Sequence, residues 1–281
     1  MTHLTRRGEQ PCSLDDNGEV SSMNSDNGLW LIGVGPGNIG LMSLDAIEAV
    51  KRCDYRFLEG YTALLPTDQE EELENLVGEY KKIMRPDVEN PEDLLKLAKE
   101  GAVALMVVGD PLQATTHIDL QLRAAEANIG CHVIHGISIT TIVTGVVGLQ
   151  SYRFGRQVTL AYPYGDYLAT SPFELILENL ERNLHTLVLL DLDPSGMGEG
   201  EQQPMSPRGA VEILQLSAKK LKHDIEDWNI VLCSDMGTTS QRINYGSLDH
   251  ISAIESGDIH CMVIPGRLDD LEQEALARWK A

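Results

Sequence analysis

The first half of the chain alternates short apolar runs with amphipathic segments. Each apolar run is short enough for a buried strand and ends in glycine, proline or another turn residue. The segments between the runs carry apolar residues three or four positions apart, which indicates helices. Strands that alternate with helices predict a parallel sheet covered on both faces. The predicted strands are 29–35, 53–60, 102–111 and 131–138, and the predicted helices are 43–51, 66–78, 91–100 and 117–130.

The second half is less regular, with longer loops between its apolar runs. We expect Ser171 to cap the first helix of this half, with Pro172 at the first helical position. A stretch rich in glycine and proline predicts a long loop in the middle. The predicted strands are 156–165, 185–193, 229–237 and 260–266, the predicted helices are 171–183 and 209–222, and the loop is 194–208.

The length and composition fit a globular protein of two α/β domains. The chain has 281 residues, of which 42% are hydrophobic and 23% charged. No apolar run is long enough to span a membrane. We predict a disordered polar tail at 1–28, an N-terminal α/β domain at 29–138 and a C-terminal α/β domain at 139–281.

The charge and the cysteines exclude several classes of partner. Lysine and arginine number 22 against 43 aspartates and glutamates, a net charge of −21. Such an acidic surface repels phosphates and anionic lipids, so we expect neither nucleic acid nor a membrane as a direct partner. The five cysteines are widely spaced and form no zinc-ligand pattern, which predicts free thiols, a cytoplasmic location and no metal site.

The glycine-rich turn after the first predicted strand has two interpretations. Gly35, Gly37 and Gly40 satisfy the dinucleotide pattern G-x-G-x-x-G, and Glu59 ends the next strand about 20 residues later. An NAD(P)-binding Rossmann oxidoreductase is therefore one candidate. Against it, Pro36 removes a backbone N–H from a turn that uses such donors to hold phosphate. The following helix also begins late, which leaves Gly40 in the loop.

A second turn, Gly109-Asp110-Pro111, follows the most apolar strand of the first half. Asp110 places a carboxylate there, Pro111 makes the turn rigid, and Gly109 lets a ligand approach the backbone. The carboxyl ends of parallel strands form the ligand crevice of an open α/β sheet. Both glycine turns are therefore predicted to face one crevice.

The motifs GVGPG and GDP, about 75 residues apart, resemble the tetrapyrrole methylases, a class of S-adenosyl-L-methionine-dependent methyltransferases. The longer strings GDPLQATTH, VIHGIS, YRFGRQVTLAYP and ENLERNLHTLVLLDL are similar to diphthine synthases in particular, of the archaeal type. The resemblance covers about residues 29–270. It implies two α/β domains of the tetrapyrrole-methylase type, a homodimer, and S-adenosyl-L-methionine bound in a cleft between the domains.

The resemblance also implies a cofactor-binding set drawn from both halves. Within it, we expect Asp110 to hydrogen-bond the cofactor or to offset its positive charge. The sequence identifies no catalytic base: Tyr61, Tyr162, His117 and His260 are possible cleft residues, and a structural role is the commoner one for each histidine. The implied cofactor-binding residues are Pro36, Asp110, Gln113, Ser138, Ile139, Leu190, Met236 and His260.

The implied activity is N-methylation of the aminocarboxypropyl-histidine intermediate on translation elongation factor 2, which gives diphthine in diphthamide biosynthesis. A methylase acting on a porphyrinoid is an alternative within the same class. A porphyrinoid carries many carboxylates, and its site should present several arginines, of which this chain has few. The NAD(P)-binding oxidoreductase is the alternative outside the class.

Overall fold

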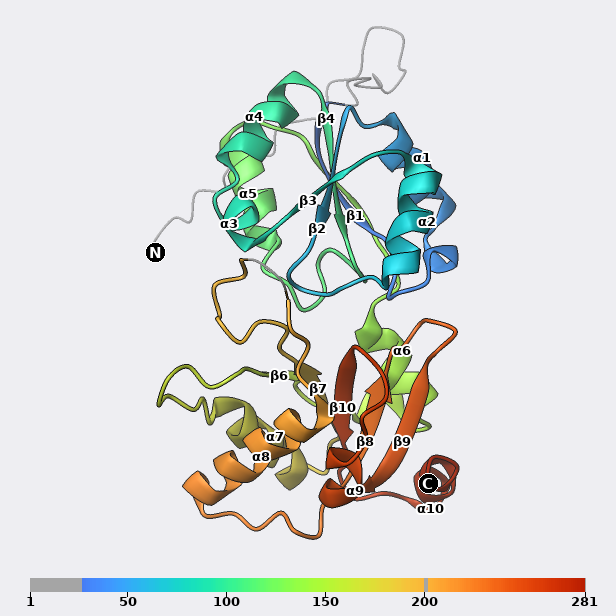
Figure 1. Cartoon of the computed structure of the whole chain (residues 1–281), viewed down its shortest axis with the longest axis vertical. Helices are drawn as coiled ribbons and strands as arrows, with labels where there is room; N and C mark the ends of the chain where they lie inside the picture. The colour runs from blue at the N-terminus through green and yellow to red at the C-terminus, as the bar shows by residue number, and fades with distance from the viewer. Residues whose placement is uncertain (1–26, 200–201, 281) are drawn as a thin grey trace, which may run out of the picture.

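The computed structural model describes residues 27–199 and 202–280, which form two sheets with helices packed around each (Figure 1). The chain passes from the first sheet to the second between Ile134 and Ile139. We propose the domain boundary at this passage. The tail predicted at 1–28 lies, up to residue 26, outside the described residues.

The first sheet has five parallel strands in the order β3-β2-β4-β1-β5. Its central strand β4 is buried at every residue, because helices cover both faces of the sheet. The parallel, doubly covered sheet predicted from the alternating pattern is confirmed. The strands are β1 (Gly28–Gly33), β2 (Tyr55–Glu59), β3 (Lys81–Ile83), β4 (Ala102–Val107) and β5 (Cys131–Ile134), and the helices are η1 (Ile39–Leu41), α1 (Leu44–Arg52), α2 (Thr67–Val77), α3 (Arg85–Glu89), α4 (Glu92–Glu100) and α5 (Ile118–Glu126).

The second sheet is mixed, in the order β6-β7-β10-β8-β9. Only β6 and β7 run parallel, and the other neighbours are antiparallel. Core clusters lie on both faces of this sheet. The strands are β6 (Val158–Leu160), β7 (Thr186–Leu190), β8 (Asn229–Ser234), β9 (Arg242–Ser247) and β10 (His260–Ile264), and the helices are α6 (Ile139–Val146), η2 (Ser151–Arg153), α7 (Ser171–Glu181), α8 (Pro207–Leu221), α9 (Leu248–Ser252) and α10 (Asp270–Ala277).

The helix caps differ from the prediction at one point. Ser171 is the first residue of α7 and not its cap, because Thr170 before it already has helical dihedrals and makes no capping bond. The next helix, α8, does have a serine cap: the Ser206 hydroxyl accepts from the Gly209 N–H at 3.1 Å. Among the described residues, no helix is both long and apolar enough to cross a membrane.

Candidate active site

The two glycine turns are hydrogen-bonded to each other at the carboxyl ends of β1 and β4. The Gly35 N–H donates to the Gly109 carbonyl at 3.2 Å, and the Gly109 N–H donates back to Gly35 at 2.8 Å. Gly136 packs against the same point, where an added Cβ would lie 2.1 Å from the Gly109 oxygen. The close approach therefore requires glycine at position 136, while Gly35 and Gly109 have the positive φ values of 82° and 87° that favour glycine.

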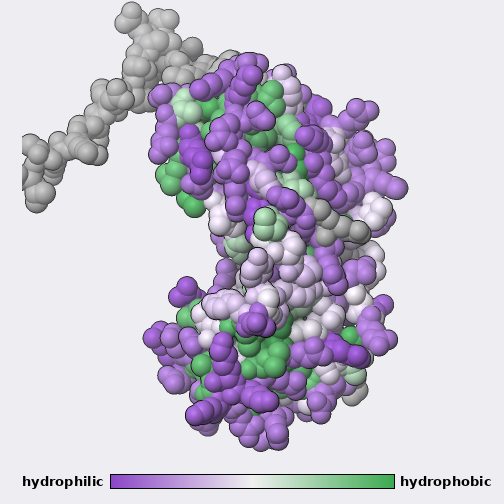
Figure 2. All heavy atoms as spheres, turned by 60° about the vertical axis from the view of Figure 1, so that its left-hand side comes forward, coloured by the Kyte–Doolittle hydropathy of each residue, from purple (hydrophilic) through white to green (hydrophobic). Residues whose placement is uncertain are grey.

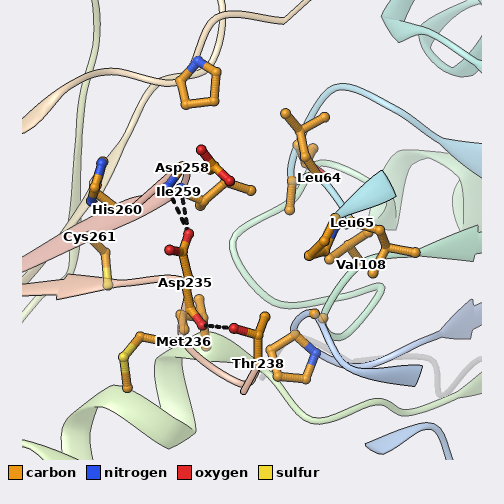
Figure 3. Close-up of a pocket in the computed structure, with 18 of the residues that line it drawn as sticks. Leu64, Leu65, Val108, Asp235, Met236, Thr238, Asp258, Ile259, His260 and Cys261 are labelled. Carbon is orange, nitrogen blue, oxygen red and sulfur yellow. Dashed lines mark hydrogen bonds between the residues drawn. The ribbon is translucent and has the colours of Figure 1, made fainter. Parts of the chain in front are cut away.

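A cavity of about 790 Å³ opens where these turns face the second sheet. Figure 2 shows the molecule hollowed between its two halves, with hydrophilic residues over most of this face. Leu64, Leu65 and Val108 face the β8 and β10 strand ends across this space (Figure 3). The structure brings all eight predicted cofactor residues to the cavity wall, and their contact with a cofactor stays a prediction. They are Pro36, Asp110, Gln113, Ser138, Ile139, Leu190, Met236 and His260.

The two halves touch beside this cavity through small residues. An added Cβ at Gly37 would lie 2.8 Å from the Thr238 methyl carbon, and one at Gly237 would lie 2.5 Å from the Pro36 ring. The turn after β1 thus packs directly against the turn after β8. The shape of the cavity depends on this contact between residues 201 positions apart.

Asp110 is buried and its carboxylate is bonded by the protein itself. Oδ1 accepts from the Leu112 N–H at 2.9 Å. Oδ2 accepts from the Gly136 N–H at 3.2 Å and from His135 Nδ1 at 2.8 Å. Asp110 therefore joins the turn after β4 to the segment after β5, while also forming part of the cavity wall.

Asp235 fixes the opposite wall and was missed by the sequence reasoning. Its carboxylate accepts from the backbone N–H groups of Asp258 and Ile259, at 2.9 and 3.0 Å (Figure 3). Its backbone has a positive φ of 51°, and its carbonyl accepts from the Thr238 hydroxyl. Turn residues of this kind carry no motif that sequence alone distinguishes from an ordinary surface turn.

Of the four possible cleft residues, only His260 lines the cavity among the described residues. Its Nδ1 is hydrogen-bonded to the Ser234 hydroxyl at 2.8 Å. Burial lowers the pKa of His260 against the opposing charges of Asp235 and Asp258, so the ring is neutral at pH 7.

His117 is buried elsewhere, where Nδ1 donates to the Pro111 carbonyl at 3.0 Å. Its role there is structural, since it holds the turn after β4.

Glu59 is committed to its own turn. Its buried carboxylate accepts from the Tyr61 N–H at 3.0 Å, from the Thr62 N–H at 2.6 Å and from the Thr62 hydroxyl. A dinucleotide-binding acidic residue needs that carboxylate for ribose hydroxyls. Because its carboxylate is already bonded within the turn, Glu59 does not act as the acidic residue that the dinucleotide pattern requires.

The cavity is acidic. The described residues that line it include four aspartates but no lysine and no arginine. Such a wall attracts cations and repels carboxylates and phosphates. The four aspartates are Asp68, Asp110, Asp235 and Asp258.

A segment after β7 reaches from the second half to α3 of the first. The Arg85 N–H donates to the Gly198 carbonyl at 3.1 Å, and its guanidinium donates to Gly196 at 3.2 Å. Asp193 folds this segment by accepting from Ser195 and from the Gly198 N–H. The hydrogen bond from the Ser195 hydroxyl is the main reason that the pKa of Asp193 is lowered.

Comparison with known proteins shows which family has this architecture. The model of the family Tetrapyrrole (Corrin/Porphyrin) Methylases matches residues 28–252. A diphthine synthase from Methanocorpusculum labreanum is 36% identical over 256 residues, covering 89% of this chain and 98% of that protein. The chain belongs to the diphthine synthase family of tetrapyrrole methylases. The resemblance predicted from the motifs, the two-sheet α/β fold and the methyltransferase class are thereby confirmed.

Other diphthine synthases agree across nearly the whole chain. The protein of that name from Methanocaldococcus jannaschii is 33% identical over 253 residues, covering 88% of this chain and 97% of its own. A crystal structure of diphthine synthase superimposes with a TM-score of 0.79 at 30% identity, covering 90% of this chain and 95% of that one. A crystal structure from Entamoeba histolytica reaches a TM-score of 0.81 at 32% identity, covering 91% and 99%.

Proposed function

We propose that this diphthine synthase family member transfers methyl groups from S-adenosyl-L-methionine to the amine of the aminocarboxypropyl-histidine intermediate on translation elongation factor 2. The product is diphthine, in diphthamide biosynthesis. The observation that carries the proposal is the acidic cavity between the two halves, which has four aspartates and no basic side chain among its described lining residues.

The cavity suits the proposed cofactor in size and charge. Its volume of about 790 Å³ lies within the range of small-molecule sites. S-adenosyl-L-methionine carries a sulfonium and an ammonium against a single carboxylate, and the aspartates favour the resulting net positive charge. Its purine suits the leucine and valine wall. We assign the cofactor to the eight predicted residues, Pro36, Asp110, Gln113, Ser138, Ile139, Leu190, Met236 and His260.

The alternatives conflict with the same observation. A porphyrinoid would bring many carboxylates toward aspartates, and a dinucleotide would bring a pyrophosphate. Neither meets a lysine or arginine among the described lining residues. The bonding of Glu59 within its own turn opposes the dinucleotide further.

Little chemical assistance is required of the protein. The cofactor would supply a methyl group bound to a sulfonium, and transfer of that methyl group leaves a neutral thioether, which is a good leaving group. The relative positions of the two reactants therefore contribute most of the rate enhancement. The acceptor amine must lose its proton before it can attack. The aspartates on the wall attract the cationic form into the cavity, and no residue is assigned as its base.

The partner of this reaction is a protein. We propose elongation factor 2 as the substrate, a homodimer as the assembly and the cytoplasm as the location. The net charge of −21 favours a cationic surface on the substrate and disfavours direct binding to nucleic acid. Because the modified histidine belongs to a large protein, the surface around the cavity mouth must contact the rest of that protein.

Mass spectrometry of elongation factor 2 tests the function. The substrate carries the aminocarboxypropyl-histidine and is incubated with this protein and S-adenosyl-L-methionine. We expect mass gains of whole methyl groups on that one histidine, and none when the cofactor is omitted. Methylation of a porphyrinoid instead, or binding of NAD and not of S-adenosyl-L-methionine in calorimetry, would overturn the proposal.

The variant Asp110→Ala tests the site. Losing this carboxylate frees the Leu112 and Gly136 N–H groups and loosens two segments of the cavity wall. We expect S-adenosyl-L-methionine to bind tens of fold more weakly, about 2 kcal/mol, in titration calorimetry. Asp119→Ala, which removes an exposed aspartate on α5, is the control. An unchanged affinity for Asp110→Ala would contradict the assignment.

A further inference from the structure

A buried carboxylate and a buried histidine face each other inside the first half. Glu59 ends β2, and His117 lies between the turn after β4 and the start of α5. Because β2 and β4 are neighbouring parallel strands, the segments that follow them lie side by side. Glu59 Oε2 is 3.9 Å from His117 Nε2, and each residue is only 1% exposed. The two side chains thus form a polar pair closed off from solvent.

The facing atoms of this pair have unused hydrogen-bonding capacity. Because His117 Nδ1 donates to the Pro111 carbonyl, Nε2 is the free position of the ring, and it has no hydrogen-bond partner among the described residues. Glu59 Oε1 accepts from the two backbone N–H groups of its turn, whereas Oε2 accepts from the Thr62 hydroxyl. Buried polar atoms are rarely left without a partner. Facing each other, Oε2 and the free Nε2 can take up one proton between them.

Thr62 connects this pair to the cavity. Its hydroxyl donates to Glu59 Oε2, and Thr62 itself lines the cavity. A hydroxyl carries one proton and two lone pairs, so Thr62 can accept a hydrogen bond from a cation while it donates to Glu59. From the cavity inward, the contacts therefore run from Thr62 to Glu59 and on to His117.

The wall around Thr62 is free for a methyl acceptor. All residues from 62 to 69 line the cavity, and none of them belongs to the eight assigned to the cofactor. Leu64 and Leu65 of this segment lie across the cavity from His260, which is one of those eight (Figure 3). The segment also contains Asp68, whose carboxylate attracts an ammonium group. An acceptor amine that approaches along this wall meets Thr62.

We propose that Thr62, Glu59 and His117 form a proton relay for the acceptor amine. This inference rests on the proposed function, in which an ammonium must lose a proton before it accepts a methyl group. The ammonium gives one proton to Thr62 Oγ1, while the hydroxyl proton moves to Glu59 Oε2 and is shared with His117 Nε2. The nitrogen keeps the electron pair of the broken N–H bond and forms the bond to the methyl carbon as the C–S bond breaks. The proton returns through Thr62 to water before the next transfer.

The variant Thr62→Val tests the relay, because it removes the hydroxyl and keeps the branched shape. We expect kcat for elongation factor 2 to fall about 100-fold at pH 7, with unchanged KM and unchanged affinity for S-adenosyl-L-methionine in calorimetry. The deficit should shrink from pH 7 to pH 9, since an alkyl ammonium loses its proton to water increasingly over this range. Thr62→Ser keeps the hydroxyl and should retain most of the activity.

The variant His117→Asn tests the inner end of the relay. An asparagine amide can still donate to the Pro111 carbonyl, but it places no acceptor at the position of Nε2. We expect kcat to fall about tenfold with the same recovery at high pH, while binding of elongation factor 2 in biolayer interferometry stays unchanged. Glu59 is left intact, because its Oε1 holds the turn that carries Thr62.

Thr159→Val is the matched control, because Thr159 is exposed in β6 and lies outside the residues that line the cavity. An equal loss in this control, or a Thr62→Val variant with the wild-type kcat at pH 7, would overturn the relay. A deficit that stays constant from pH 7 to pH 9 would do the same, since it would mean a purely structural role. These results leave the proposed function standing if the wild type methylates elongation factor 2. No methylation by the wild type would overturn the proposed function and the relay together.

Discussion

The two halves of the molecule line the same cavity with different kinds of groups. In the first half, the wall includes backbone turns held within hydrogen-bonding distance of each other, as between Gly35 and Gly109, beside the side chains of Leu64, Leu65 and Val108. In the second half, the wall consists of strand ends and side chains, such as Asp235, Met236 and His260. The first wall is fixed locally by glycine geometry, whereas the second depends on the position of whole strands.

The position of those strands depends on a buried ionic network far from the cavity. Glu272 of α10 is fully buried and accepts from the Gln150 and Asp269 N–H groups, from His185 Nε2 at 3.0 Å and from the Arg153 guanidinium. His185 and Glu272 are 87 residues apart in sequence. We therefore expect the loss of a charge to destabilise the second half most, and the addition of a methyl group to destabilise the first half most.

The largest effect is expected for Glu272→Ala. The change leaves the partly buried Arg153 with the more distant Asp269 carboxylate, at 3.9 Å, as its charged partner, and it removes acceptors from His185 and two backbone groups. Breaking a buried pair from one side costs about 3–5 kcal/mol. Urea unfolding should show this loss, while Glu274→Ala, at an exposed position on the same helix, should change stability little. Equal stability of the two variants would refute the role given to the network.

A slightly smaller effect is expected for Gly136→Ala in the first half. The added Cβ would lie 2.1 Å from the Gly109 oxygen, so one of the two turns must move. We expect a loss of about 3 kcal/mol and weaker binding of S-adenosyl-L-methionine. Gly145→Ala on α6 is the control, because nothing lies within 4 Å of its added Cβ. A wild-type affinity for Gly136→Ala would mean that the turns tolerate displacement.

This contrast also explains what the sequence could and could not predict. Local signals located the turns at Pro36 and Asp110, because glycine and proline after an apolar run identify a strand end. The same reasoning missed β3, which has only three residues, and β9, whose sequence RINYGS lacks a clear apolar face. It also missed α6, whose β-branched residues have low helix propensity.

The candidate site, too, could be predicted from the sequence only in part. The eight cavity residues followed from the family resemblance, and the cavity brings them together. The roles of Asp235 and Glu272 were not accessible, because each depends on partners brought close by the tertiary fold. Asp110 shows the limit within a recognised motif: the motif gives its position, but not that both oxygens are bonded by the protein.

A smaller effect is expected from acidification, and it should fall on the second half. Burial lowers the pKa of His185, against the hydrogen bond and charge of Glu272, and burial also lowers the pKa of His260. The unfolded chain therefore takes up protons first, and stability should fall as the pH drops below the ordinary histidine value of 6.5.

A further loss is expected below about pH 4.5. Burial acts to raise the pKa of Glu272, but hydrogen bonds from Gln150, Asp269 and His185 outweigh it and lower that pKa. The carboxylate thus stabilises the fold above its unfolded-state value of 4.5, and this contribution is lost as the pH falls through the lowered value.

The tryptophans separate the two halves in this measurement. Trp30 lies in β1, whereas Trp228 and Trp279 pack against clusters of the second half. Urea unfolding of Trp30→Phe reports the second half, and that of Trp228→Phe/Trp279→Phe reports the first. Between about pH 7.5 and 5.5 the midpoint should fall more for the second half. An equal fall in both would place the titrating groups elsewhere.

The smallest effect is expected where the halves are joined by the segment after β7. Arg85→Ala removes the guanidinium bond to Gly196 but keeps the backbone bond to Gly198, so the segment loses one of two attachments to α3. Because the guanidinium is partly exposed, the cost should be about 1 kcal/mol or less. Calorimetry should show S-adenosyl-L-methionine binding a few-fold more weakly, because the segment flanks Leu192 and Pro204 on the cavity wall. Arg123→Ala removes an exposed ion pair within α5 and should leave binding unchanged. If the two arginine variants bind alike, the contact between Pro36 and Gly237 suffices to hold the halves together, and the segment contributes nothing to the cavity.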